Sequence, residues 1–193
     1  MSHATGHGQG GEGENKKVAL LISALALLLA IAETFGKSAQ TDALRYYVEA
    51  SNTWAFFQAK TMRKTTLETA AEQMQIDAEL ARDPSVKQLL ERRVSAWKDR
   101  AARYENDPQT GEGRQELMAK AKALEARTAH ALATYHSFEY GSAALQIAIV
   151  LASAYIITGV MHLLWVAGAL GVIGLVFSVL GFAAPYAAAL GAH

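Results

Sequence analysis

The C-terminal part of this chain, from Ser142 to His193, contains no Asp, Glu, Lys or Arg. A transmembrane helix needs about 20 predominantly apolar residues, and residues 142–164 and 165–190 each meet that length. The short, uncharged connection at His162–Trp165 makes the two helices antiparallel neighbours. Because lipid offers no hydrogen-bond partner to an irregular backbone, this segment predicts a transmembrane helical hairpin.

A third apolar segment follows Lys16 and Lys17 near the N-terminus. We predict a first transmembrane helix over residues 17–36, with Glu33 near the membrane interface. The lysine pair favours a cytoplasmic N-terminus. The same pattern also fits a secretory signal with a cleavage site at Ala30–Ala32. The long polar region before the lysines favours a retained anchor.

The region between the first and second spans, residues 37–141, is rich in charge of both signs and poor in helix breakers. Its main breaks are at Pro84 and Pro108, which end helices or connect them. Three polar helices are therefore expected, at about Ser38–Arg82, Ser85–Glu105 and Glu112–Tyr140. We expect the third to continue into the second span, and the first span to continue into the first polar helix.

Apolar residues recur in each polar helix at alternating steps of three and four, as in coiled coils and helical bundles. In the first helix the predicted seam includes Tyr47, Trp54 and Phe57. The predicted fold class is an all-α membrane protein with three transmembrane helices and a long antiparallel coiled-coil or bundle domain between spans 1 and 2. The Gly-rich residues 1–16 are expected to form a disordered tail.

Small residues line one side of each of the three predicted spans, with Ala144, Ala148 and Ala152 spaced by four in span 2. Such residues let helix backbones approach closely in lipid. One interpretation is a contact between copies of the chain, and the other is packing within one chain. The residues in question are Ala19, Ser23, Ala26 and Ala30 in span 1, and Ala167, Gly171, Gly174, Ser178 and Gly181 in span 3.

Composition excludes several functions. Lys and Arg number 18, as do Asp and Glu, and no dense basic patch indicates nucleic-acid binding; the absence of Cys excludes thiolate chemistry. The chain contains no phosphate-binding loop, dinucleotide fingerprint or zinc-protease motif. His136 and Glu139 are interpreted as a polar pair rather than a metal site. We therefore predict no catalytic, cofactor-binding or metal-binding residues.

Residues 49–63, EASNTWAFFQAKTMR, combine crowded aromatic rings with polar groups that do not all fit on a solvent-facing side. We interpret this segment as a packed seam in which buried amides bind a neighbouring helix, and a ligand site is the alternative. This segment and FEYGSAALQIAIVLAS (residues 138–153) resemble the bacterial membrane family called domain of unknown function 4337. The resemblance implies a multi-pass bacterial inner-membrane protein and supplies no catalytic residue. Its hallmark positions are Glu49, Asn52, Trp54, Gln58 and Lys60.

These observations favour a non-enzymatic, membrane-anchored helical scaffold or accessory subunit. Its expected partners are membrane lipid and either further copies of the chain or a larger membrane complex. An oligomeric channel is the first alternative, because uncharged spans with small residues suit a narrow pore. A metal-binding or enzymatic helical bundle is the second.

Overall fold

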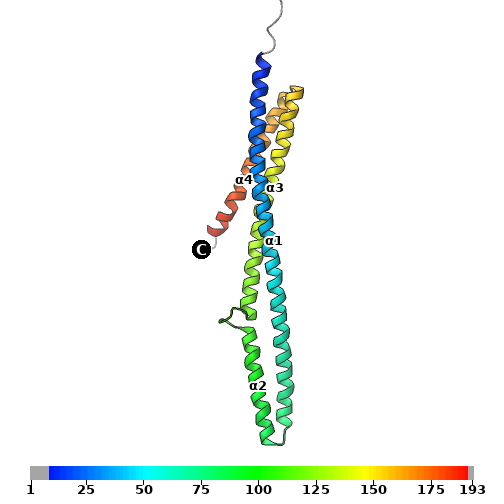
Figure 1. Cartoon of the computed structure of the whole chain (residues 1–193), viewed down its shortest axis with the longest axis vertical. Helices are drawn as coiled ribbons and strands as arrows, with labels where there is room; N and C mark the ends of the chain where they lie inside the picture. The colour runs from blue at the N-terminus through cyan, green and yellow to red at the C-terminus, as the bar shows by residue number, and fades with distance from the viewer. Residues whose placement is uncertain (1–8, 191–193) are drawn as a thin grey trace, which may run out of the picture. The chain divides into compact units, whose positions relative to one another are not determined.

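The computed structural model describes residues 9–190, with side chains for residue 13 and residues 15–183. Within this range the chain is helical and contains no strand, which confirms the predicted all-helical fold class. Three of its helices are long and apolar enough to cross a membrane, namely α1, α3 and α4. The helices are α1 (Gln9–Leu80), α2 (Pro84–Glu105), α3 (Arg114–Thr158) and α4 (Met161–Leu190) (Figure 1).

Helix α1 begins earlier than predicted and does not stop at the end of the first apolar segment. It starts at Gln9, within the segment that was expected to form a disordered tail; residues 1–8 lie outside the described part. Once the apolar segment has nucleated a helix, each added residue contributes a hydrogen bond at little further cost. Gly36 does not interrupt α1, and a Cβ there would lie 3.2 Å from the Cβ of Phe138.

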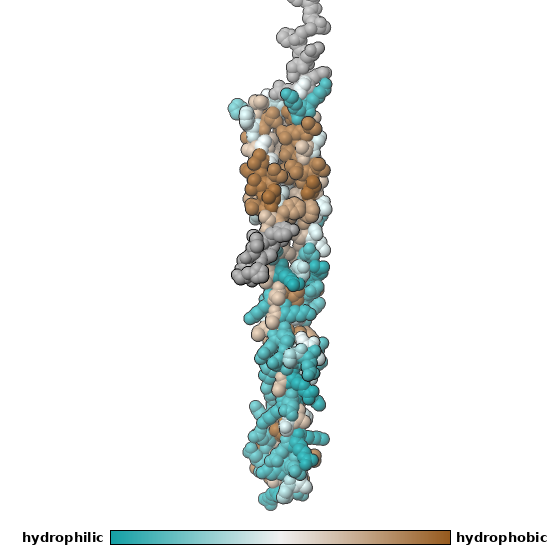
Figure 2. All heavy atoms as spheres, turned by 90° about the vertical axis from the view of Figure 1, so that its left-hand side faces the viewer, coloured by the Kyte–Doolittle hydropathy of each residue, from teal (hydrophilic) through white to brown (hydrophobic). Residues whose placement is uncertain are grey.

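The chain forms two units, which we describe separately: unit 1 is Met1–Ala43 with Ala129–His193, and unit 2 is Leu44–Thr128. In unit 1 the apolar segments of α1, α3 and α4 pack together. Hydrophobic side chains also cover the face of these segments that Figure 2 shows, and Leu20, Ile157 and Val172 are mostly exposed. The two buried clusters are Leu25, Ala32, Phe138, Leu145 and Ala148, and Val18, Ala152, Tyr155 and Ala167.

The turn between α3 and α4 lies earlier than predicted. Helix α3 ends at Thr158 and α4 begins at Met161, so the connection is Gly159–Val160 rather than His162–Trp165. Gly159 has φ +69° and donates its N–H to the carbonyl of Tyr155 at 2.8 Å. A left-handed glycine of this kind ends a helix without strain. Hydropathy does not register this signal, because the residues on both sides remain apolar.

Helices α3 and α4 approach closely at Gly141 and Gly174. A Cβ on Gly174 would lie 2.7 Å from Cγ of Leu145 and 2.9 Å from the carbonyl oxygen of Gly141. A Cβ on Gly141 would meet Oγ of Ser178 at 2.9 Å. The small residues of α4 therefore serve packing within one chain. We call them the inner stripe: Ala167, Gly171, Gly174, Ser178 and Gly181.

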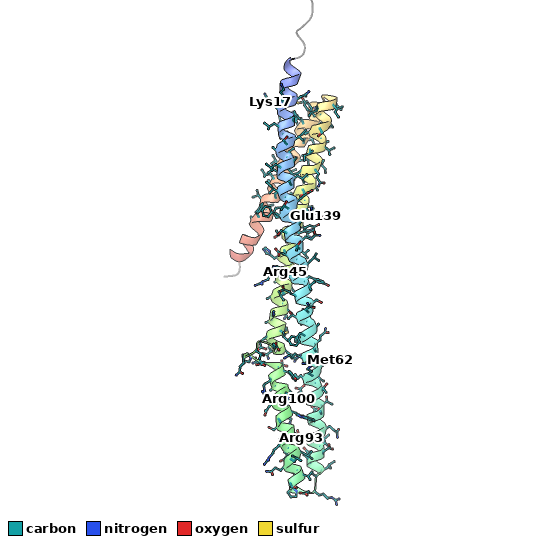
Figure 3. The ribbon with its side chains drawn as sticks, viewed as in Figure 1. Lys17, Arg45, Met62, Arg93, Arg100 and Glu139 are labelled. Atoms are coloured by element: carbon teal, nitrogen blue, oxygen red, sulfur yellow. The ribbon has the colours of Figure 1, made fainter. Side chains whose placement is uncertain are left out.

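Unit 2 pairs the second half of α1 with α2 and the first part of α3. The turn before α2 follows the predicted proline break, and Asp83 caps the helix by accepting the Ser85 N–H at 2.8 Å. The other sides of these helices carry exposed residues such as Met62, Arg93 and Arg100 (Figure 3). Coiled-coil geometry stays a prediction. Buried positions are Ala50, Ala71 and Ala78 in α1, Val94 and Ala101 in α2, and Leu117, Ala121 and Leu124 in α3.

The close approach in unit 1 predicts that Gly174→Ala destabilises the protein by about 1–3 kcal/mol, because the added methyl overfills a packed contact. Gly168→Ala is a matched control on the same helix, since nothing lies within 4 Å of a Cβ there. Thermal unfolding of both variants in the same detergent measures the difference. Equal unfolding temperatures for the two variants would contradict the packing assignment.

Candidate functional site

The hallmark residues of α1 fall into two groups. Lys60 is buried and Trp54 is half-buried, whereas Glu49, Asn52 and Gln58 are exposed. The prediction of buried amides in this segment is therefore wrong. The reason is the spacing of residues along α1, which places Thr53 and Lys60, and not the amides of Asn52 and Gln58, on the buried side.

The buried side of α1 in unit 2 follows steps of four, three and four through Thr53, Phe57, Lys60 and Lys64. Thr53 and Lys60 are buried, and Phe57 and Lys64 are half-buried. A seven-residue repeat of this kind keeps one side of a helix facing a partner. Two lysines thus occupy successive positions of a side that otherwise carries mostly apolar residues.

Trp54 joins α1 to α3. Its indole N–H donates to Oε1 of Glu125 at 2.8 Å. Its ring packs edge-on against Phe57, with centroids 5.3 Å apart. The indole therefore contributes apolar contact within α1 and a directional bond to the neighbouring helix.

Lys60 lies among rings and one carboxylate. Its Nζ is 3.5 Å from Oε2 of Glu112. The same atom lies 5.1 Å from the ring centroid of Phe56 and 5.4 Å from that of Tyr104. Cation–π attraction and the ion pair together offset the cost of removing the ammonium from water.

A second group of charges joins the end of α2 to the start of α3. Glu105 pairs with Lys64 at 2.9 Å and with Arg114. Arg114 also donates to Oγ1 of Thr61 at 2.8 Å, and its guanidinium lies 4.9 Å from the ring centroid of Phe57. All three helix segments of unit 2 meet in this network.

The network shifts the pKa values of Glu105 and Lys64. The hydrogen bond from Lys64, and then the contacts with Arg114, lower the pKa of Glu105 below its ordinary value of about 4.5. The hydrogen bond to Glu105 in turn raises the pKa of Lys64. The charged forms of both groups are therefore favoured in the folded chain.

The connection between α2 and α3, residues 106–113, is held by its own hydrogen bonds. The N–H of Gly111 donates to the carbonyl of Asp107 at 2.8 Å, and the N–H of Glu112 donates to Oγ1 of Thr110 at 3.3 Å. A Cβ on Gly113 would lie 2.5 Å from the backbone nitrogen of Asp107. This packing fixes where α3 restarts, and with it the positions of Glu112 and Arg114.

The arrangement is suited to fixing the alignment of helices rather than to a reaction. Charged groups inside a helix contact disfavour other alignments, since a shifted helix would leave them unpaired. Among residue 13 and residues 15–183, whose side chains the structure describes, no three His, Asp or Glu residues are grouped to hold a metal. Sequence reasoning missed Lys64, Glu105 and Arg114, although the steps of three and four between Phe57 and Leu67 pass through Lys60 and Lys64.

The predicted transmembrane packing residues also fall into two groups, one packed inside the chain and one exposed. Gly171, Gly174 and Gly181 are buried and Ser178 is half-buried, whereas Ala26 is exposed. The polar pair predicted at the end of the third polar helix is observed in unit 1. The Nδ1 of His136 lies 3.1 Å from Oε2 of Glu139, and both side chains are exposed.

We predict that Lys60→Met leaves the free energy of unfolding unchanged or raises it by about 1 kcal/mol. Methionine fills a similar volume without the cost of burying an ammonium, and Glu112, whose side chain is 54% exposed, stays solvated. Denaturant unfolding of the full chain provides the measurement. Lys120→Met, at an exposed position of α3, should change stability by less than about 0.5 kcal/mol. A loss of more than about 2 kcal/mol in Lys60→Met would contradict this account.

Acid titration tests the Glu105 network. Because the folded pKa of Glu105 is lowered, its contribution to stability is complete above about pH 4.5 and is lost as the pH falls through the folded pKa. Glu105→Gln should cost under about 1 kcal/mol at neutral pH and make stability fall less steeply below pH 4.5. Denaturant unfolding at several pH values checks this, with the exposed Glu91→Gln as control. Identical pH profiles for wild type and Glu105→Gln would refute it.

Comparison with known proteins bears on the family alone. No curated protein and no solved structure matches the chain. The family model described as Domain of unknown function (DUF4337) matches residues 14–184. This range includes both segments whose resemblance to the family is noted above. The chain therefore belongs to the DUF4337 family.

Proposed function

We propose that this chain is a non-enzymatic, membrane-anchored helical scaffold that associates with further copies of itself through its first span. The observation that carries the proposal is the exposure of four small residues of α1, which we call the outer stripe. The inner stripe of α4 contacts α1 and α3, whereas the outer stripe faces away from them. The outer stripe consists of Ala19, Ser23, Ala26 and Ala30.

The outer stripe has the chemistry of a helix contact in lipid. Its residues follow steps of four, three and four, so they lie on one side of α1. Leu20 and Leu27, which are 72% and 63% exposed, lie on the adjacent side. Small residues allow two backbones to approach, and van der Waals contact then replaces the hydrophobic effect that lipid does not supply. Ser23 already donates its hydroxyl to the carbonyl of Ala19 at 3.0 Å, so its burial costs little.

The proposed location is the inner membrane of a bacterium, with all three apolar helices crossing the bilayer. The lengths of these helices support it. So do the apolar side chains that unit 1 exposes, because water would disfavour so extensive an apolar surface. In this setting unit 2 presents a charged helical surface for other subunits of a membrane complex.

Disulfide cross-linking tests the proposal cleanly, because the natural chain contains no Cys. Ala26→Cys in native membranes should give a covalent dimer on mild oxidation. Leu27→Cys is the matched control, since it lies on the adjacent exposed side of the same turn, and should cross-link several-fold more slowly. Equal cross-linking of the two positions, or none at Ala26→Cys, would overturn the proposal.

Two further variants distinguish a specific contact through the outer stripe from random collision of chains in the membrane. Ala26→Ile in a Ser23→Cys chain should abolish cross-linking at residue 23, because the larger side chain holds the backbones apart. Leu27→Ala in the same chain should leave cross-linking unchanged. Cross-linking that persists in the Ala26→Ile chain would show that the outer stripe is not the contact.

A further inference from the structure

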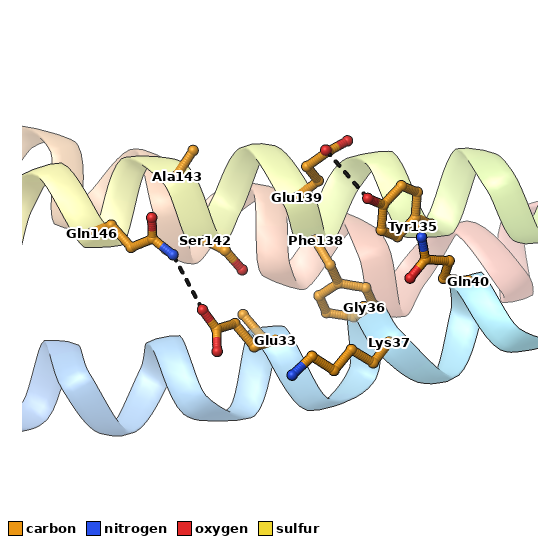
Figure 4. A pocket seen from close by; sticks show the side chains of 11 residues that line it. Glu33, Gly36, Lys37, Gln40, Tyr135, Phe138, Glu139, Ser142, Ala143 and Gln146 are labelled. Carbon is orange, nitrogen blue, oxygen red and sulfur yellow. Dashed lines mark hydrogen bonds between the residues drawn. The ribbon is translucent and has the colours of Figure 1, made fainter.

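A polar groove of about 360 Å³ lies between α1 and α3 in unit 1 (Figure 4). Its floor includes Ala32 and Phe138, and its polar lining comes from both helices. The side chains that matter below are Glu33 and Lys37 of α1, and Tyr135, Glu139, Ser142 and Gln146 of α3.

The groove marks the position where both helices change from apolar to polar sequence. On α1 the uncharged run that begins at Val18 ends at Glu33, and on α3 no charge follows Glu139. If the apolar runs occupy the hydrocarbon core, as the proposed function requires, residues at their ends lie at the level of lipid headgroups. The groove is thus open to headgroups rather than to bulk water alone.

Opposite charges lie one helical turn apart in the groove. Gln146 donates its amide N–H to Oε1 of Glu33 at 3.1 Å, and Oε2 of Glu33 has no partner among the described residues. Lys37 is exposed and makes no ion pair with any residue that the structure describes. Glu139 belongs to the rim, where it accepts from the Tyr135 hydroxyl at 3.3 Å.

Ser142 supplies an unpartnered hydroxyl inside the groove. It is only 8% exposed, and Figure 4 shows its oxygen directed toward α1. Helical serines usually bond the carbonyl four residues earlier, as Ser137 does at 3.1 Å and Ser153 at 2.8 Å. Ser142 makes no such bond and has no other partner within the described part of the chain. Its oxygen is not among the fully buried unpartnered atoms of the described residues, where Thr134 Oγ1 stands alone, so the Ser142 hydroxyl is accessible from the groove and free to donate to a bound group.

We propose that this groove binds the headgroup of a phospholipid that carries a primary ammonium and a phosphate, as phosphatidylethanolamine does. The ammonium donates to Oε2 of Glu33, and the phosphate accepts from Lys37. The Ser142 hydroxyl donates to the headgroup from the buried side. Both lipid charges are thereby matched to fixed charges of opposite sign.

Two other common headgroups fit less well. A choline group cannot donate a hydrogen bond to Glu33, because its nitrogen carries no proton. A glycerol headgroup can place its phosphate on Lys37 and donate a hydroxyl to Glu33, but it lacks the cation that strengthens the bond to the carboxylate. The groove therefore predicts discrimination between headgroups, and not general affinity for lipid.

Native mass spectrometry of the detergent-solubilised full chain tests the proposal. The chain is titrated separately with phosphatidylethanolamine, phosphatidylcholine and phosphatidylglycerol of identical acyl chains. Phosphatidylethanolamine should bind about tenfold more tightly than the other two, as expected for one charge-assisted hydrogen bond. Glu33→Gln should remove this difference, and Ser142→Ala should weaken binding of all three lipids several-fold, because its hydroxyl donates to the phosphate that they share. Glu72→Gln, which neutralises an exposed carboxylate outside the groove, should preserve it.

Lys37→Met provides a second arm that does not depend on Glu33 variants folding, because Lys37 is exposed; it should weaken binding of phosphatidylethanolamine about tenfold. Equal binding of the three lipids by wild type, an unchanged preference in Glu33→Gln, or an unchanged affinity for phosphatidylethanolamine in Lys37→Met would overturn the proposal. Competition by soluble phosphoethanolamine at lipid concentrations would overturn the assignment to lipid. If Ala26→Cys does not cross-link but the headgroup preference is observed, the proposed self-association is wrong and the headgroup site stands.

Discussion

The seven-residue spacing of buried side chains on α1 is the constraint on which both units depend. In unit 1 it buries Val18, Leu25 and Ala32, and in unit 2 it passes through Ala50, Thr53 and Phe57. In a straight helix, side chains seven residues apart shift gradually around the axis, because seven residues are slightly less than two full turns. The same side of α1 therefore stays in contact with its neighbours only where the seven-residue spacing continues without an insertion or deletion. A single insertion in α1 would rotate everything after it by about 100°.

The two units use this spacing with different chemistry. Unit 1 relies on close backbone approach at Gly141 and Gly174, which is effective where water contributes no driving force. Unit 2 inserts Lys60 and Lys64 into the buried side and pairs them with carboxylates. These lysines are acceptable beside water and would be costly in lipid. Each type of contact therefore suits the surroundings that its own sequence predicts.

As proposed, the outer stripe and the headgroup groove have separate roles at successive levels of one side of α1, because the steps of three and four through the outer stripe continue to Glu33 and Lys37. The outer stripe offers small residues for a second copy of the chain. The groove, at Glu33 and Lys37, offers paired charges for lipid. Neither role needs a reactive group, which is consistent with a scaffold whose work is to hold helices at a defined depth and spacing in a membrane. Exposed hallmark residues such as Asn52 and Gln58 stay available for a further partner.

Sequence alone determined the helices, the break at Pro84, the polar connection around Pro108 and the three apolar segments, because propensity, proline and hydropathy act locally. It did not determine which side of each helix is buried. Tyr47 was expected in the seam of α1, yet it is 64% exposed, because the repeat passes through Tyr46 instead. The position of the turn at Gly159 was also not predicted, because hydropathy does not distinguish one left-handed glycine within an apolar segment.

Only the tertiary structure decided which small residues are internal. The outer stripe and the inner stripe look alike in sequence, because alternating steps of three and four indicate one side of a helix without naming what covers it. The structure gives the inner stripe to contacts with Leu25, Leu145 and Phe138 and leaves Ala26 exposed. The reason is physical: burial depends on the side chains that a partner helix contributes at the same level, and those residues are distant in sequence.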